Sequence, residues 1–200
     1  MKNILKMMIF LSLSIFLFSC DVKVNLIYDG TKISLQFNAL AEKGFEKLLN
    51  SLDSENQNYI DTNEIISSLE KSGYKNVKAN LQDNKELSIS LEDINKILLS
   101  TQILKVEDGL LKEDFSVNAL KSFYNSSDEQ ILQFLDLLLA PVFNDEKMTT
   151  SEYLEIIASF YGQELADELK ESKLIITSQN SSKKIKHTYQ LVELLCGNYE

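Results

Sequence analysis

Four pairs of strand-like segments, each joined by a short turn, constrain the fold of this chain more than any other feature. The first pair covers residues 22–26 and 33–37, with Asp29-Gly30 between them. Apolar and polar residues alternate in both segments, which is typical of half-buried strands, and an Asp-Gly turn favours an antiparallel β-hairpin. Three further hairpins are predicted in the same way, from 77–81 with 87–91, 103–106 with 110–115, and 174–177 with 185–189.

Helical patterns lie between these hairpins. They are predicted over residues 40–52, 62–72, 92–99, 117–124, 129–140 and 150–170. Ser116 and Ser127 precede helical runs as N-caps, and Thr149 with Glu152 has the spacing of a capping box. Gly162 is a candidate break within the last helix. Antiparallel hairpins interleaved with helices predict an α+β fold, with the helices packed on one face of the sheet.

Composition narrows the possible partners. The 200 residues carry a net charge of −10, and all 20 basic residues are lysine. Nucleic-acid binding needs clustered cations, so we expect no nucleic-acid partner. The chain shows no internal repeat and no evident linker, and residues 20–200 are therefore predicted to form one domain.

The amino terminus has the pattern of an export signal. Lys2 and Lys6 precede an apolar run over residues 7–18, and Ser19 is a small residue suited to a cleavage site. The run is shorter than the ~20 apolar residues that a spanning helix needs. Residues 1–19 are therefore predicted to be a removable signal peptide.

The end of this segment, Leu17-Phe18-Ser19-Cys20, resembles the lipobox of bacterial lipoproteins, in the looser form found in spirochaetes. Phe18 departs from that motif, which usually has a small residue at this place. The resemblance implies that Cys20 becomes the acylated first residue of the mature chain. It also implies a cell-envelope location with a lipid anchor in the membrane.

The strand-like pattern begins at Val22, two residues after Cys20. A connection this short has almost no reach, so we expect the domain to lie close to the membrane and to face the periplasm. Because the chain is acidic, a lysine-bearing edge is expected to turn toward anionic lipid. Lys183, Lys184 and Lys186 form the densest such cluster.

Residues 53–64 resemble the calcium loop of the EF-hand family. Asp53, Ile60, Asp61 and Glu64 stand at matching positions, but Asn58 replaces the usual Gly. Glu55 and Gln57 are longer than the ligands usual in such loops, which predicts weak calcium binding at best. The alternative is a polar loop between two helices, in which Asp61 or Thr62 caps the second helix. We assign no metal ligand and no cofactor.

Neither of the two residues best suited to nucleophilic chemistry has an evident orienting group. His187 alternates with Ile185 and Tyr189 on a predicted strand and is interpreted as a packed or rim residue. Cys196 follows Leu194 and Leu195 and is interpreted as a small buried side chain in a C-terminal tail. We therefore predict no catalytic residue and no enzyme activity.

The favoured hypothesis is an envelope lipoprotein with a binding or assembly role, whose expected partners are the membrane and, in an assembly role, another envelope protein. The alternatives are a calcium-binding lipoprotein that uses residues 53–64 and, less favoured, an envelope enzyme based on carboxylates.

Overall fold

The computed structural model describes residues 21–40, 42–44, 47, 61–71, 73–83, 85–92, 104–107, 110–125 and 148–196. Its strands are β1 (Asp21–Tyr28), β2 (Ile33–Leu40), β3 (Lys75–Gln82), β4 (Glu86–Glu92), β5 (Leu104–Glu107), β6 (Leu110–Glu113), β7 (Lys173–Gln179) and β8 (Lys184–Gln190). Its helices are α3 (Thr62–Lys71), α5 (Val117–Asn125), α7 (Thr150–Tyr161), α8 (Gln163–Glu171) and α9 (Leu191–Cys196).

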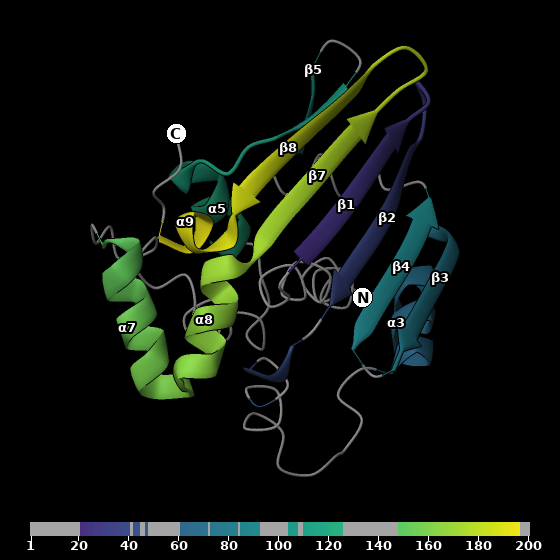
Figure 1. Ribbon diagram of the computed structural model, residues 1–200. Helices are drawn as coiled ribbons and strands as arrows, with labels where there is room; N and C mark the ends of the chain where they lie inside the picture. Colours follow the sequence, from purple (N-terminus) through teal and green to yellow (C-terminus); the bar gives the residue numbers. More distant parts are fainter. Residues whose placement is uncertain are drawn as a thin grey trace.

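Six strands form an open sheet in the order β3-β4-β2-β1-β7-β8, and β5 and β6 form a separate hairpin (Figure 1). All four predicted hairpins are present and antiparallel. The first and last hairpins of the large sheet meet through a parallel pairing of β1 with β7, which the sequence analysis did not predict. The α+β fold class is confirmed.

The turn chemistry of two hairpins explains why they form where they do. In the β1–β2 turn, one carboxylate oxygen of Asp29 accepts from the backbone N–H groups of Thr31 and Lys32, at 2.8 and 2.6 Å. Gly30 has a φ of 97°, a backbone conformation that favours glycine. In the β7–β8 turn, Asn180 Oδ1 accepts in the same way from the N–H groups of Ser182 and Lys183.

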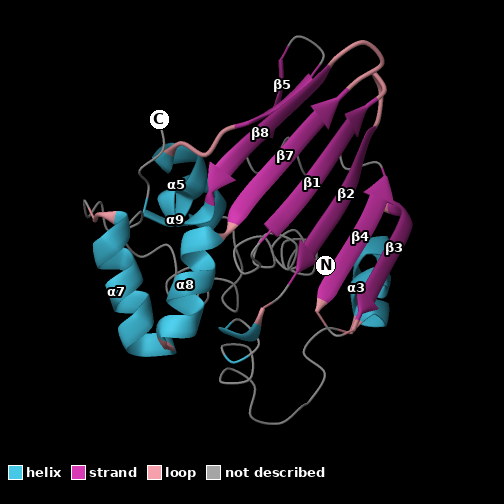
Figure 2. Cartoon of the chain, viewed as in Figure 1, coloured by secondary structure: helices cyan, strands magenta, loops and turns pink. Residues whose placement is uncertain are grey.

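The register of the strands separates the sheet into an inner and an outer face. One inner row runs across all six strands through Ala79, Ile89, Phe37, Val24, Ile176 and His187. The apolar residues of the inner face join side chains from α3, α7, α8 and α9 in a single hydrophobic core. No described helix lies in front of the outer face (Figure 2), which agrees with the predicted packing of helices on one side.

The predicted helix caps and the predicted helix break are confirmed where the structure describes them. Thr149 and Glu152 form the expected capping box at the start of α7, and the Ala119 N–H donates to Ser116 Oγ at the start of α5. Gly162, with a φ of 94°, separates α7 from α8, so the predicted helix over 150–170 is two helices. Glu92, the first residue of the predicted helix over 92–99, ends β4 instead, and the rest of that helix, the predicted helix over 129–140 and Ser127 lie outside the described residues.

Two further boundaries differ from the predictions. Leu40 ends β2 instead of beginning a helix, although residues 43, 44 and 47 of the predicted 40–52 segment are helical. The expected C-terminal tail is wrong over Leu191–Cys196, which forms α9 and buries five of its six side chains.

None of the described helices has the length and apolar character needed to cross a membrane.

Candidate functional site

A buried carboxylate at the edge of the inner face is the most unusual polar feature of the described residues. The Glu113 side chain, on β6, is 3% exposed, whereas that of His187, on β8, is 45% exposed. His187 Nδ1 and Tyr189 OH both contact Glu113 Oε1, and the Tyr189 bond is 2.7 Å long. Phe115 packs edge-on against the Tyr189 ring, with the centroids 5.3 Å apart. These residues form what we call the Glu113 cluster.

The β5–β6 hairpin brings Glu113 to this position. Leu110 and Leu111 are both buried, and the Leu111 backbone N–H donates to Ser178 Oγ on β7 at 3.1 Å. Because side chains alternate along a strand, Leu111 and Glu113 point to the same face of β6. The hairpin therefore carries a leucine and a glutamate together onto the inner face of β7 and β8.

The energetics of the Glu113 cluster favour a structural role, in which the cluster links the β5–β6 hairpin to β8. A buried carboxylate is costly unless donors satisfy it, and here an imidazole and a phenol do so. Burial, followed by the hydrogen bond and the charge of Glu113, raises the pKa of Tyr189 well above its usual value. Tyr189 therefore remains a neutral donor at physiological pH. The cluster joins the small hairpin to the edge strand of the sheet.

His187 is oriented by Glu113 and not by Cys196. The Cys196 side chain lies buried in α9. Burial and the nearby charge of Glu193 raise the pKa of its thiol to about 11. The thiolate is the reactive form, so at neutral pH this cysteine is a poor nucleophile. The interpretations of His187 as a packed or rim residue and of Cys196 as a buried one are confirmed, but the expectation that His187 lacks an orienting group is wrong, because Glu113 contacts its Nδ1.

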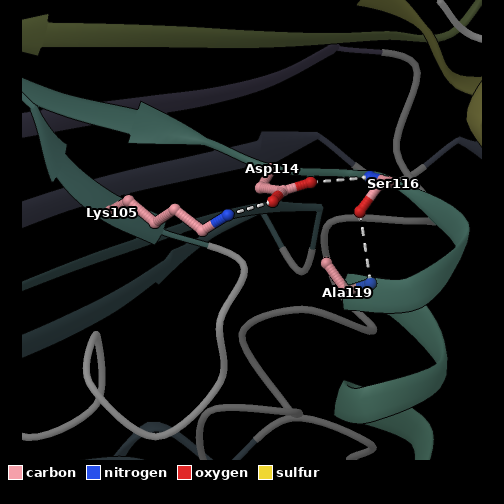
Figure 3. A network of polar contacts seen from close by, with 4 residues as sticks. All are labelled: Lys105, Asp114, Ser116 and Ala119. Carbon is pink, nitrogen blue, oxygen red and sulfur yellow. Dashed lines mark hydrogen bonds and ion pairs between the residues drawn. The ribbon is translucent and has the colours of Figure 1, made fainter.

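A second polar network joins the same hairpin to α5 (Figure 3). One Asp114 carboxylate oxygen forms an ion pair with Lys105 on β5, and the other accepts from the Ser116 N–H at 3.0 Å. Ser116 in turn accepts from the first turn of α5. Asp114 thus links both strands of the hairpin to the helix that follows.

This network predicts a pH-dependent contribution to stability. Bonds from Lys105 and then Ser116 lower the pKa of Asp114 to about 2 in the folded chain, against ~3.9 when unfolded. The contribution of the ionised Asp114 carboxylate to folding stability is therefore complete above pH ~4 and disappears as the pH falls from ~4 to ~2. In urea unfolding, Asp114→Asn should be less stable than wild type at pH 6, and the two should converge near pH 2. A difference that is unchanged at pH 2 would show that Asp114 acts without its charge.

The outer face of the sheet is a second candidate surface. One complete row crosses the six strands as Lys78, Ser90, Gln36, Asn25, Thr177 and Lys186. The adjacent row is Asn80, Ser88, Asn38, Lys23, Ile175 and Thr188. All but one of these residues are polar, and lysine is the only charged type among them.

The residues singled out by the sequence are spread over the chain. Cys20 and residues 53–60 of the proposed calcium loop lie outside the described residues. At the end of that loop, Asp61 Oδ1 accepts from the Asn63 N–H at 2.8 Å, so Asp61 caps α3 as the alternative interpretation proposed. Among the described residues, no three His, Cys, Asp or Glu side chains are grouped so that they could hold a metal ion.

Sequence reasoning missed Glu113. It lies two residues after Leu111 in a predicted strand, so the alternation placed it on the face of a buried leucine. Nothing in the local sequence, however, connects it to His187 and Tyr189, which lie 74 and 76 residues away. No family model matches the chain, and a search of curated proteins finds no relative.

Proposed function

We propose that this chain is an envelope lipoprotein, anchored in a membrane through an acylated Cys20, that acts by binding or assembly and not by catalysis. The observation that carries the proposal is the junction between the signal pattern and the fold. The residue after Cys20 is Asp21, and Asp21 is the first residue of β1. The proposed cleavage would release a chain that begins one residue before the sheet.

The position of β1 supports close attachment to the membrane. β1 is an interior strand, paired with β2 on one side and with β7 on the other. Asp21 itself is paired with Lys173. A flexible linker of n residues reaches ~5–6 Å × √n, so a single residue adds little reach. We propose that the domain rests at the headgroups and faces the periplasm.

The contacts of the candidate residues support the non-catalytic part of the proposal. Glu113 is engaged by two side chains of the same protein, and burial keeps Cys196 in its thiol form. Both arrangements stabilise the fold and present no activated nucleophile. A binding or assembly role uses the surface of the domain instead.

Intact-mass analysis of protein extracted from membranes tests the anchor. The expected mass lacks residues 1–19 and carries several additional acyl groups, because a lipoprotein cysteine holds more than one chain. Cys20→Ser should carry no acyl groups and should leave the membrane fraction or remain uncleaved. The proposal is wrong if the wild-type chain retains Met1 or an unmodified Cys20. In intact cells, protease should degrade the protein only after the outer membrane is permeabilised.

A further inference from the structure

The outer face of the sheet differs in charge from the rest of the molecule. Its two central rows contain Lys23, Lys78 and Lys186 and no acidic residue. The flanking rows add Lys75, Lys173 and Lys184, together with Asp21, Glu86 and Glu92. The face therefore carries six lysines and three acids, a net charge of +3, whereas the whole chain carries −10.

This face is broad as well as basic. Neighbouring strands lie ~4.8 Å apart, so the five spacings from β3 to β8 span ~24 Å. Lys78 and Lys186 stand at the two ends of one row, and Lys23 lies between them on β1. All three side chains are exposed. Positive charge is thus distributed across the width of the face.

The proposed anchor enters at this same face. Val22 points into the core, and side chains alternate along a strand, so Asp21 belongs to the outer face. Because β1 is the fourth strand of six, its first residue, Asp21, lies near the middle of the sheet's width. A membrane reached from that point can extend under the whole face.

We propose that the outer face of the sheet lies flat on the membrane, where its lysines contact anionic lipid headgroups. This inference rests on the proposed lipid anchor. Lysines near an anionic bilayer are attracted to it within about one Debye length, ~8 Å at physiological ionic strength. The acidic remainder of the domain then faces away from the lipid, which reduces its repulsion.

The proposal refines the expectation for Lys183, Lys184 and Lys186. In the strand register, Lys184 is level with Ile27, six residues along β1 from Asp21. At ~3.3 Å per residue this is ~20 Å from the anchored end. A domain standing on its anchored end would hold these lysines away from the bilayer. A domain lying flat brings Lys184 and Lys186 to the headgroups together with Lys23 and Lys78.

Fluorescence quenching in reconstituted vesicles tests the orientation. The membrane-extracted, acylated protein is labelled at Gln36→Cys, on the outer face, or at Gln163→Cys, at the start of α8. Both native glutamines are exposed, and Cys196 is buried. The vesicles contain phosphatidylcholine with a headgroup nitroxide quencher, with or without phosphatidylglycerol. We expect stronger quenching at Gln36 than at Gln163 when phosphatidylglycerol is present. The difference should shrink in 1 M salt, where the Debye length falls to ~3 Å.

A matched pair of charge variants separates the role of the face from that of total charge. Lys23→Gln, Lys78→Gln and Lys186→Gln in one chain should remove the preferential quenching at Gln36. The control makes the same Lys→Gln change at Lys32, Lys71 and Lys170, which are exposed lysines outside the outer face. This control should retain the preferential quenching at Gln36.

The outcomes distinguish the two proposals. If acyl groups are absent, the lipid anchor itself is wrong. If the protein is acylated but Gln163 is quenched as strongly as Gln36, only the flat orientation is wrong. If quenching at Gln36 is the same with and without phosphatidylglycerol, contact between the lysines and anionic lipid is excluded. If the protein is acylated but the label at Gln36 is not quenched by the lipid nitroxide, a protein partner covers this face and the proposal is wrong.

Discussion

Phe37→Ala is expected to lower the free energy of unfolding by ~3–5 kcal/mol, the usual cost of deleting a fully buried aromatic side chain. Phe37 is 0% exposed and lies on β2, an interior strand. Its register partners are Val24 on β1 and Ile89 on β4. Alanine would therefore leave a cavity in the core that the sheet shares with the helices. Urea unfolding followed by circular dichroism measures the loss.

Gln36→Ala is the matched control, because Gln36 is the preceding residue on the same strand but points to the outer face. It should change stability by no more than ~0.5 kcal/mol, as surface substitutions usually do. Similar losses for the two variants would mean that the outer face is covered in solution. A loss below ~1 kcal/mol for Phe37→Ala would contradict the position of the core.

Glu113→Gln should cost ~1.5–3 kcal/mol, the range for a hydrogen bond to a charged group. Glutamine keeps the shape of the side chain but loses the charge that His187 and Tyr189 contact. The loss should appear in urea unfolding at neutral pH. Glu113→Gln should also loosen the attachment of the β5–β6 hairpin to β8. Hydrogen exchange at the Leu111 N–H, which donates to Ser178, should therefore become faster.

A double-mutant cycle with Tyr189→Phe tests whether the two residues act as a unit. Residues in one hydrogen-bond network typically show a coupling energy of ~0.5–3 kcal/mol. Glu107→Gln on β5 is the control, because Glu107 is half-exposed and pairs with Lys112 within the hairpin; it should have little effect. Strictly additive losses for Glu113→Gln and Tyr189→Phe would show that the Glu113 cluster is not a network.

The four hairpins were predictable because their information is local. Asp29 accepts from backbone groups two and three residues later, and Asn180 does the same at the last turn. The capping box at Thr149 and the break at Gly162 likewise involve neighbours within four residues. Turn and cap chemistry acts over such distances, so residue type and spacing were sufficient to place these features.

The candidate site was only partly predictable for the same reason. Strand alternation placed His187 with Ile185 and Tyr189 on one face, and the structure places that face at the rim of the core. Glu113 gains its partners only when the β5–β6 hairpin packs onto β7 and β8. Its sequence neighbours would look the same if it were exposed, as Glu107 is.

The amino-acid sequence by itself determined the hairpins, the capped helices that the structure describes and the side of each strand that faces the core, because turn chemistry and the two-residue period act between near neighbours. Only the tertiary structure decided that β1 pairs in parallel with β7, more than 140 residues later. Backbone hydrogen bonds between strands are the same for any residue type, so they do not identify a distant partner. Burial of Val24 against Ile176 in a common core selects that partner, and the same selection creates both the Glu113 cluster and the basic outer face.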